Sequence, residues 1–159
     1  MNTGIVYIYT CPKPLGYFTI TLDQQEKVLT CIFVDKKSVT KSVLPQDITI
    51  ALDAFFMQKK NLPKTLISKH VTGSDFQKSI WEVIKKVPLG KTISYTDIAE
   101  KVGNKNAVRA AGTACGRNPL ALFIPCHRVV RKTGEDYGYS WGADRKKWLL
   151  AFEREGKIV

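Results

Sequence analysis

The sequence has few acidic residues, no long apolar run and no closely paired cysteines. Only 14 Asp and Glu stand against 25 Lys and Arg among 159 residues. No apolar stretch approaches the roughly 20 residues that a membrane-spanning helix needs. The N-terminus also lacks the basic segment that opens a signal peptide. These absences predict a cytoplasmic protein, or a nuclear one in a eukaryote, that has no membrane partner.

The four cysteines form no Cys-x-x-Cys pair; they are Cys11, Cys31, Cys115 and Cys126. Cys11, Cys31 and His70 could meet as a metal site, but their spacing is not typical of zinc ligands, so we expect none. A disulfide between Cys11 and Cys31 remains possible, although such bonds are unusual inside a cell.

The net charge of +11 is the strongest compositional signal. An apolar content of 44% and a charged content of 25% are ordinary for a globular domain. An excess of positive charge favours a polyanionic partner such as a nucleic acid. A lysine-rich surface with no particular partner would give the same net charge, so charge alone locates no binding face.

Residues 1–73 predict a small antiparallel sheet covered by one helix. Residues 5–9, 17–22 and 28–34 are rich in β-branched and aromatic side chains, and turn residues at 14–16 and 23–25 separate them. Ile48, Leu52, Phe55 and Phe56 then recur at helical spacing, so a helix should cover the sheet. No catalytic grouping occurs here, and we expect a structural domain.

Residues 74–159 predict a mostly helical second domain. Ser74 and Gln77 have the spacing of a capping box. The helix that they open has an apolar stripe formed by Phe76, Ile80, Val83, Ile84 and Val87. The chain as a whole is thus expected to be an α+β protein.

Two further short helices are expected after residue 93. Ser94 is a candidate N-cap for a helix that Gly103 ends, and Asn104 is a candidate N-cap for another that runs to about Cys115. Two short helices joined by a tight turn are typical of a helix-turn-helix, although an ordinary helical hairpin is the alternative.

The second helix of this pair has a slim and basic face. Lys105, Arg109 and Thr113 lie at i, i+4 and i+8, and Ala107 and Ala110 are small. This combination suits close approach to a nucleic-acid groove. The opposite side of the helix is predicted to pack inward through Val108, Ala111 and Cys115.

The C-terminal part predicts a loop and a final helix. The loop at 134–142 contains Tyr137, Tyr139 and Trp141, and Asp144 is a candidate cap for the helix that follows. Glu153 lies beside the apolar face of that helix, where it is either solvated at the edge or buried with a partner.

The centre of the sequence is the hexapeptide IPCHRV at 124–129. A thiol and an imidazole are adjacent in it, between apolar residues on both sides. The thiolate is the reactive form of cysteine, so Cys126 needs a base or a positive field to react at neutral pH. His127 and Arg128 could supply either, but a buried and inert core cysteine is the commoner case.

The sequence resembles the O6-alkylguanine-DNA alkyltransferases, also called methylated-DNA–protein-cysteine methyltransferases. The shared motifs occur in the right order: VPLGKTISY at 87–95, AVRAAG at 107–112, RNP at 117–119, PCHRV at 125–129, and Tyr139 with Ser140. The resemblance covers about residues 76–153. The N-terminal half matches loosely, mainly through PLG at 14–16.

The resemblance implies direct reversal of DNA damage by a single-turnover methyltransferase. A protein of this kind flips O6-alkylguanine, and by extension O4-alkylthymine, out of duplex DNA. It then transfers the alkyl group irreversibly to its own cysteine, here Cys126. His127 would act as the base, through a water molecule, Glu153 would orient the imidazole, and Asn118 would brace the active-site turn. The separation between Cys126 and Glu153 along the chain matches that of the family.

The resemblance also implies a ribonuclease-H-like N-terminal domain and a helix-turn-helix that enters the minor groove. It assigns substrate binding to Tyr95, Val129, Tyr139, Ser140 and Lys146. It assigns DNA binding to Arg109, which would fill the place of the extruded base, and to Lys105, Ala107, Ala110, Thr113, Arg117 and Arg128. No cofactor is expected, because the nucleophile and the leaving group suffice, and the protein is expected to act as a monomer.

Three other functions compete with alkyl transfer. A binding protein related to the alkyltransferases would sense lesions without repairing them, but such relatives lack the reactive cysteine. A helix-turn-helix regulator would leave the group formed by Cys126, His127 and Glu153 without a role. A cysteine hydrolase would not explain the basic helix.

Overall fold

The computed structural model describes residues 2–133 and 138–155. The chain forms two compact units, residues 1–72 with 119–123 and residues 73–118 with 124–159. The predicted α+β class is confirmed, with a three-stranded antiparallel sheet and helix in the first unit and a mostly helical second unit. The predicted second domain had no interruption, whereas the structure groups 119–123 with the first unit.

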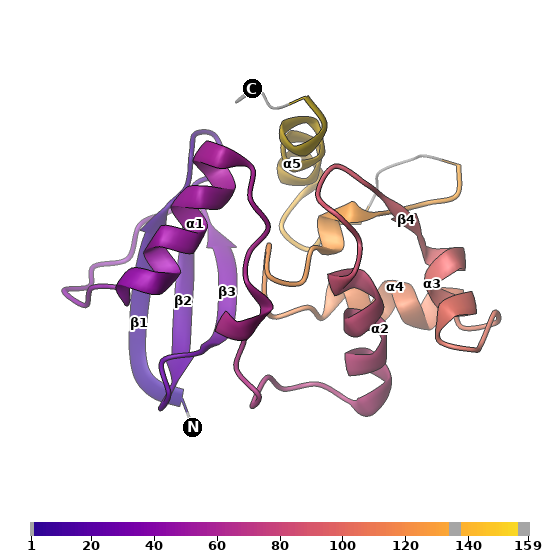
Figure 1. Cartoon of the computed structure of the whole chain (residues 1–159), viewed down its shortest axis with the longest axis horizontal. Coiled ribbons are helices and arrows are strands. Elements are labelled where there is room, and N and C mark those ends of the chain that lie inside the picture. Colours follow the sequence, from indigo (N-terminus) through magenta and orange to yellow (C-terminus); the bar gives the residue numbers. More distant parts are fainter. Residues whose placement is uncertain (1, 134–137, 156–159) are drawn as a thin grey trace. The chain divides into compact units, whose positions relative to one another are not determined.

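The first unit is a meander of three strands, β1 (Asn2–Thr10), β2 (Tyr17–Asp23) and β3 (Val28–Val34), in the order β1-β2-β3 (Figure 1). Alternate residues of β2 are buried because successive side chains point to opposite faces of a strand; they are Phe18, Ile20 and Leu22. Segment 119–123 joins this unit through the edge of β3, where the amide of Cys31 donates to the Pro119 carbonyl and its own carbonyl accepts from the amide of Ala121.

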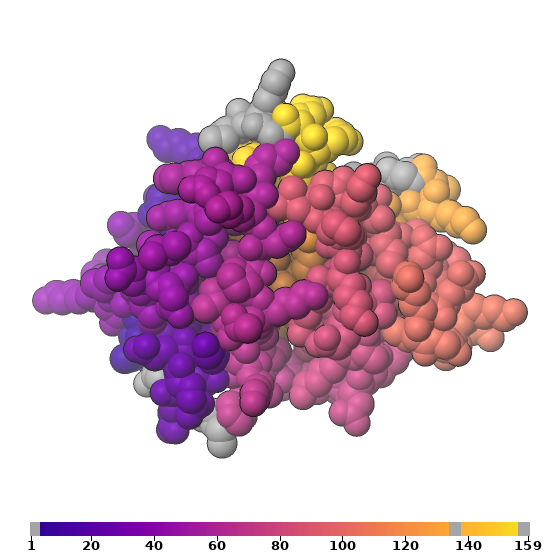
Figure 2. All heavy atoms as spheres, in the orientation of Figure 1, coloured from indigo at the N-terminus to yellow at the C-terminus, as the bar shows by residue number. Residues whose placement is uncertain are grey.

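Helix α1 (Gln46–Gln58) covers one face of the sheet, as the periodicity predicted (Figures 1 and 2). Its apolar stripe is buried through Ile48, Leu52, Phe55 and Phe56. Tyr9 of β1 stacks on Phe56 and donates a hydrogen bond of 2.7 Å to Asp53. A short turn, η1 (Lys64–Leu66), follows.

In the second unit, α2 (Asp75–Lys85) begins with the predicted capping box. The Ser74 hydroxyl accepts from the amide of Gln77, and the Gln77 side chain accepts from the amide of Ser74. Phe76 was predicted to be buried, but 36% of it is exposed. The buried residue is Trp81, whose indole donates at 3.0 Å to the carbonyl of Ala114 in helix α4 (Val108–Gly116) and so ties α2 to α4.

The helix-turn-helix consists of α3 (Tyr95–Lys101) and α4 (Val108–Gly116). Ser94 caps α3 as predicted, through a 3.0 Å bond from the amide of Asp97. Asn104 does not cap α4: its side chain accepts from the amide of Asn106 in the preceding turn, a local bond that asparagine favours. Helix α4 therefore starts at Val108, which is exposed rather than packed inward.

A two-stranded parallel ladder links the start of α3 to the central hexapeptide. Strand β4 (Ile93–Ser94) pairs with β5 (Val129–Val130), directly after the turn η2 (Cys126–Arg128). The last helix is α5 (Ala143–Glu155). Asp144 was predicted to cap this helix, but it lies inside the first turn. The predicted loop residues 134–137, with Tyr137, lie outside the described residues.

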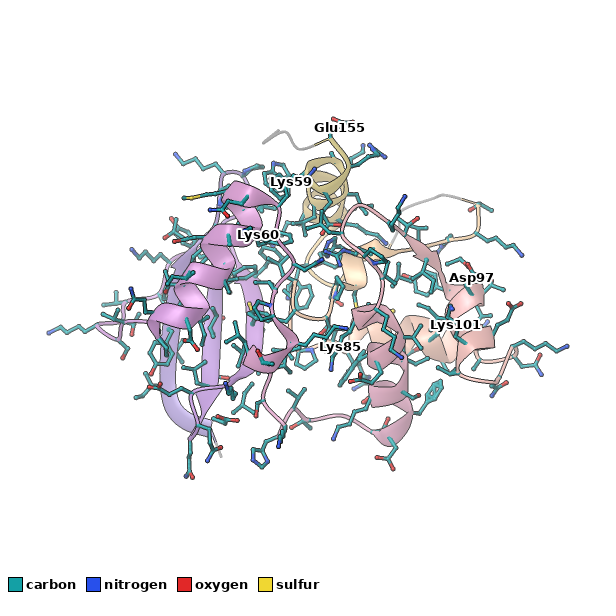
Figure 3. The ribbon with its side chains drawn as sticks, in the orientation of Figure 1. Lys59, Lys60, Lys85, Asp97, Lys101 and Glu155 are labelled. Atoms are coloured by element: carbon teal, nitrogen blue, oxygen red, sulfur yellow. The ribbon has the colours of Figure 1, made fainter. Side chains whose placement is uncertain are left out.

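Three of the lysines labelled in Figure 3 lie at the C-terminal ends of helices, and Lys59 is the C-cap of α1. Lys85 ends α2 and Lys101 ends α3. Within the described part of the chain, no helix is both long enough and apolar enough to cross a membrane.

Candidate active site

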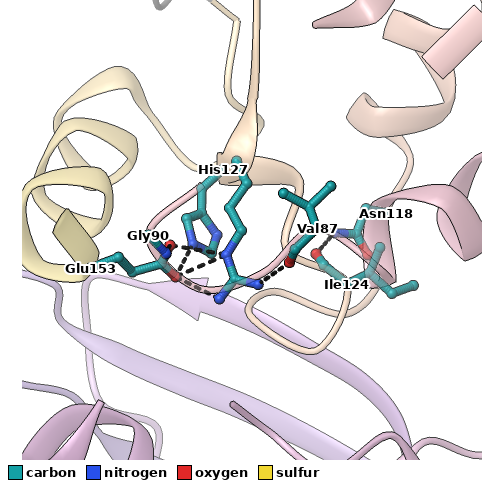
Figure 4. Close-up of polar contacts among 7 residues, drawn as sticks. Val87, Gly90, Asn118, Ile124, His127 and Glu153 are labelled. Atoms are coloured by element: carbon teal, nitrogen blue, oxygen red, sulfur yellow. Dashed lines mark hydrogen bonds and ion pairs between the residues drawn. The ribbon is translucent and has the colours of Figure 1, made fainter. Parts of the chain in front are cut away.

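Cys126 lies at the start of η2 and is buried, with 4% of its surface exposed. Its amide donates to the carbonyl of Ile124 at 2.7 Å. The same carbonyl accepts from the side-chain amide of Asn118 at 2.8 Å (Figure 4). The Asn118 side chain also hydrogen-bonds the Cys126 thiol. Asn118 follows α4 directly, so one side chain connects the end of this helix to the turn that carries the thiol.

His127 and Arg128 both bind Glu153 of α5 (Figure 4). His127 Nε2 lies 2.7 Å from Glu153 Oε1, and the Arg128 guanidinium donates to both carboxylate oxygens at 2.8–3.1 Å. Arg128 also donates to the carbonyl of Val87 at 2.8 Å. All three side chains are buried. Of the two readings for Glu153, the structure shows the buried one, with partners.

This network sets the charge state of Glu153. Burial alone would raise the pKa of the carboxyl, but the charges and hydrogen bonds of His127 and Arg128 outweigh burial and hold the pKa at about 2. Glu153 is therefore ionised at neutral pH. Since arginine side chains in proteins carry a positive charge, the bidentate contact of Arg128 stabilises the ionised form of Glu153.

The same network sets the tautomer of His127. Burial lowers the pKa of the imidazole, although Glu153 opposes the shift, so the ring is neutral at pH 7. A carboxylate can only accept, so the proton of the neutral ring is on Nε2. Nδ1 is then the lone-pair nitrogen, and it is buried without a hydrogen-bond partner among the described residues. His127 is thus arranged to accept a proton at Nδ1.

The thiol of Cys126 is protonated in the resting protein. Burial raises its pKa well above the usual value, and the neighbouring Cys115 adds to this, while Asn118 and Lys146 oppose it. A buried neutral thiol needs a base in order to react, and His127 is the adjacent residue in the sequence.

We expect the protein to lose stability in acid in two steps. His127 has a lowered folded pKa, so its contribution is complete above its unfolded value of 6.5 and falls as pH drops below it. Glu153 contributes above 4.5, and this contribution, up to about 3 kcal/mol, is lost as pH falls towards about 2. Urea unfolding between about pH 7 and about pH 4 measures the first step. A free energy of unfolding that stays constant across this range would contradict it.

Four predicted substrate-binding residues make defined contacts. Lys146 is buried in α5, and its ammonium group donates to the Val129 carbonyl at 2.6 Å. The Ser140 hydroxyl donates to the carbonyl of Gly116, the last residue of α4, at 2.9 Å. Tyr139 packs edge-on against Trp141. The loop at 139–141 is thus fastened to the end of α4.

The exposed face of α4 carries most of the predicted DNA contacts, namely Arg109, Ala110 and Thr113, with Arg117 at its C-cap. Beside it is an open hollow of about 530 Å³. Tyr95, Arg109, Gly112 and Thr113 line this hollow, together with Arg131 and Lys132. Sequence reasoning missed Arg131 and Lys132, although two adjacent basic residues directly after β5 were a usable signal.

Three predicted DNA contacts do not lie on the exposed face of α4. Arg128 is buried on Glu153, so its guanidinium is not available to a phosphate. Ala107 is buried just before α4. Lys105 is exposed but lies in the turn before the helix, so it does not share the helical face of Arg109.

Cys11 and Cys31 are buried in the first unit and are not joined by a disulfide. The described residues contain no cluster of three or more His, Cys, Asp or Glu side chains that could hold a metal ion.

Comparisons with known proteins show the family of this chain. Residues 75–155 match the family model for the DNA-binding domain of 6-O-methylguanine DNA methyltransferase. A probable methylated-DNA–protein-cysteine methyltransferase of Acanthamoeba polyphaga mimivirus is 39% identical over 133 residues, covering 84% of this chain and 86% of that protein.

Solved structures give the same result. The O6-methylguanine methyltransferase of Mycobacterium tuberculosis is 28% identical, with a TM-score of 0.79, over 95% of this chain and 94% of that one. A crystal structure of Mycobacterium tuberculosis OGT in complex with DNA has a TM-score of 0.77 at 29% identity, over 93% of each chain. The chain described here belongs to the O6-methylguanine DNA methyltransferase, or methylated-DNA–protein-cysteine methyltransferase, family.

Proposed function

We propose that this protein repairs O6-alkylguanine, and also O4-alkylthymine, by moving the alkyl group to Cys126 in a single irreversible turnover. The observation that carries the proposal is which ring nitrogen of His127 holds the proton and which one is free to accept one. Glu153 holds the proton on Nε2, so the unpartnered Nδ1 is the basic atom of a histidine adjacent to a buried thiol. This is the arrangement of nucleophile, base and orienting acid that activates thiols.

The proposed step balances as a displacement at carbon. Nδ1 of His127 takes the thiol proton, and the Cys126 sulfur attacks the alkyl carbon as the carbon–O6 bond breaks. The guanine gains the electron pair of that bond and is then protonated. The Ser140 hydroxyl already donates to Gly116, so its backbone amide is the better donor towards O6. Tyr95, Val129, Tyr139 and Lys146 complete the proposed pocket for the base.

We propose that α4 enters the minor groove of the duplex and that the protein acts as a monomer. Apart from Arg109, the face carrying Ala110 and Thr113 has small side chains, which suits a narrow groove. Arg109 is exposed on the same face beside the hollow and would occupy the stack after the base has left.

The test of the function is a stoichiometric transfer assay. The protein is mixed with a duplex that carries one O6-methylguanine with an isotopically labelled methyl group, and intact mass and peptide mapping locate the label. We expect at most one methyl group per chain, on Cys126. A parallel duplex with O4-methylthymine tests the second substrate. Several turnovers per chain, or binding of the lesion with no transfer, would overturn the proposal.

Arg109→Ala should separate work on duplex DNA from work on the base itself. Opening a stack costs a few kcal/mol, so loss of the residue that holds it open should slow repair of duplex roughly tenfold or more. Reaction with the free modified base should stay near the wild-type rate, because no stack has to be opened.

Single-turnover rates on both substrates check the Arg109 prediction, with Lys105→Ala as the matched control, since Lys105 is basic but lies before the helix. Equal losses on the duplex and on the free base would refute the proposed role.

A further inference from the structure

A second thiol lies beside the proposed alkyl acceptor. Cys115, in the last turn of α4, hydrogen-bonds the Cys126 side chain, and both are buried free cysteines. Asn118 connects the two backbones: its amide donates to the Cys115 carbonyl at 3.3 Å and its side chain to the Ile124 carbonyl at 2.8 Å. These two bonds of Asn118 hold the backbone around both cysteines in place, and so keep the two sulfurs close together.

Cys115 has no part in the proposed alkyl transfer. The side chains proposed to contact DNA lie on the exposed face of α4, whereas Cys115 is on the buried face with Ala111 and Ala114. The Ala114 carbonyl accepts from the Trp81 indole, which holds this turn of α4 against α2. Cys115 therefore lies in a held turn of α4, next to the thiol proposed as the alkyl acceptor.

We propose that Cys115 and Cys126 form a reversible disulfide when the protein meets a peroxide, and that this bond protects the alkyl acceptor from irreversible oxidation. This disulfide rests on the proposed function, because it would be a second state of the alkyl acceptor Cys126, from which a reductant restores the thiol. Its first readout is a covalent bond within the protein, which can be measured whether or not methyl transfer occurs.

The chemistry balances with hydrogen peroxide as the oxidant. The Cys126 sulfur attacks one peroxide oxygen, and the O–O bond breaks to give a sulfenic acid and water. The Cys115 sulfur then attacks the sulfenic sulfur, the S–O bond breaks, and a second water leaves as the disulfide forms. Two electrons pass from the two thiols to one peroxide. A dithiol reverses the bond by exchange, whereas a sulfenic acid without a nearby thiol continues to sulfinic acid.

Cys126 is the thiol that reacts first, because a base lies next to it in the sequence. Nδ1 of His127 is buried without a partner among the described residues and can take the thiol proton. Cys11 and Cys31 form the other neighbouring pair, in the first unit, but burial and Cys11 raise the pKa of the Cys31 thiol. Burial also raises the pKa of Cys126, so oxidation should need peroxide in excess of the protein.

The experiment treats the whole protein with hydrogen peroxide, blocks the remaining thiols with iodoacetamide in denaturant, and maps the peptides. Before the thiols are blocked, we expect the intact mass of wild type to fall by two hydrogen atoms, and after blocking we expect a peptide that joins Cys115 to Cys126. Dithiothreitol should restore both thiols. In Cys115→Ala we expect Cys126 as sulfinic acid, which dithiothreitol does not reduce. Cys11→Ala is the control and should still form the 115–126 bond.

A second readout is the number of methyl groups that each chain can accept. It is measured before oxidation, after oxidation, and again after treatment with dithiothreitol. Each variant is normalised to its own reduced sample, so a weaker but folded Cys115→Ala protein still answers the question. Wild type should recover most of its capacity, and Cys115→Ala should recover little.

Two results would overturn the disulfide: wild-type Cys126 found as sulfinic acid beside a free Cys115 thiol, or a disulfide only between Cys11 and Cys31. A 115–126 bond in a protein that transfers no methyl group would instead overturn the proposed function and leave the disulfide standing.

Discussion

Replacing Cys126 by serine is expected to reduce methyl transfer below detection while binding to the methylated duplex remains. The serine hydroxyl is close in size to the thiol but is far harder to ionise, and it is a weak nucleophile at neutral pH. The proposed DNA-binding side chains lie on the exposed face of α4, whereas Cys126 is buried and is not part of that face. The expected variant recognises the lesion and cannot remove the methyl group.

Two measurements check this result together: intact mass after incubation with the methylated duplex, and the dissociation constant from fluorescence anisotropy on the same duplex. Cys11→Ala is a matched control, since it removes a buried thiol from the first unit and should transfer normally. Methyl groups found on Cys115 in the serine variant would contradict the assignment of the acceptor.

Local patterns in the sequence were enough to predict most of the fold. The sheet, the covering stripe of α1 and the caps at Ser74 and Ser94 depend on neighbours within a few residues, so periodicity and capping rules find them. Asn104 shows the limit of such rules. Its side chain has two local choices, a helix cap or a turn, and the structure contains the turn.

The site was harder to predict because its contacts are long-range. Resemblance to a family gave Cys126, His127 and Glu153, but the sequence did not indicate that Arg128 would share the carboxylate. An arginine in a basic protein that follows a reactive cysteine is naturally taken as a DNA contact. Only the packing of α5 against η2 shows that its partner is an acid 25 residues away.

The shared carboxylate leads to the largest stability effect that we expect. Glu153→Gln leaves the Arg128 guanidinium buried without a counter-charge, and breaking a buried pair in this way costs about 3–5 kcal/mol. The midpoint of thermal unfolding should fall by roughly 2–4 °C for each kcal/mol in a protein of this size. Glu82→Gln is the matched control, because Glu82 pairs with Lys85 at the surface and its loss should cost no more than about 1 kcal/mol.

A double variant separates the structural role of Glu153 from its role towards His127. Adding Arg128→Met to Glu153→Gln removes both buried charges, and apolar replacement of a whole pair is often neutral for stability. Urea unfolding should therefore show most of the lost free energy restored.

Methyl transfer by the double variant should stay slow, because a neutral amide at position 153 no longer stabilises the imidazolium that forms when His127 accepts the thiol proton. Single-turnover rates measured well below the melting temperature of each variant decide the point. Recovery of transfer together with stability would mean that Glu153 only balances the charge of Arg128, and that the orientation of His127 does not depend on it.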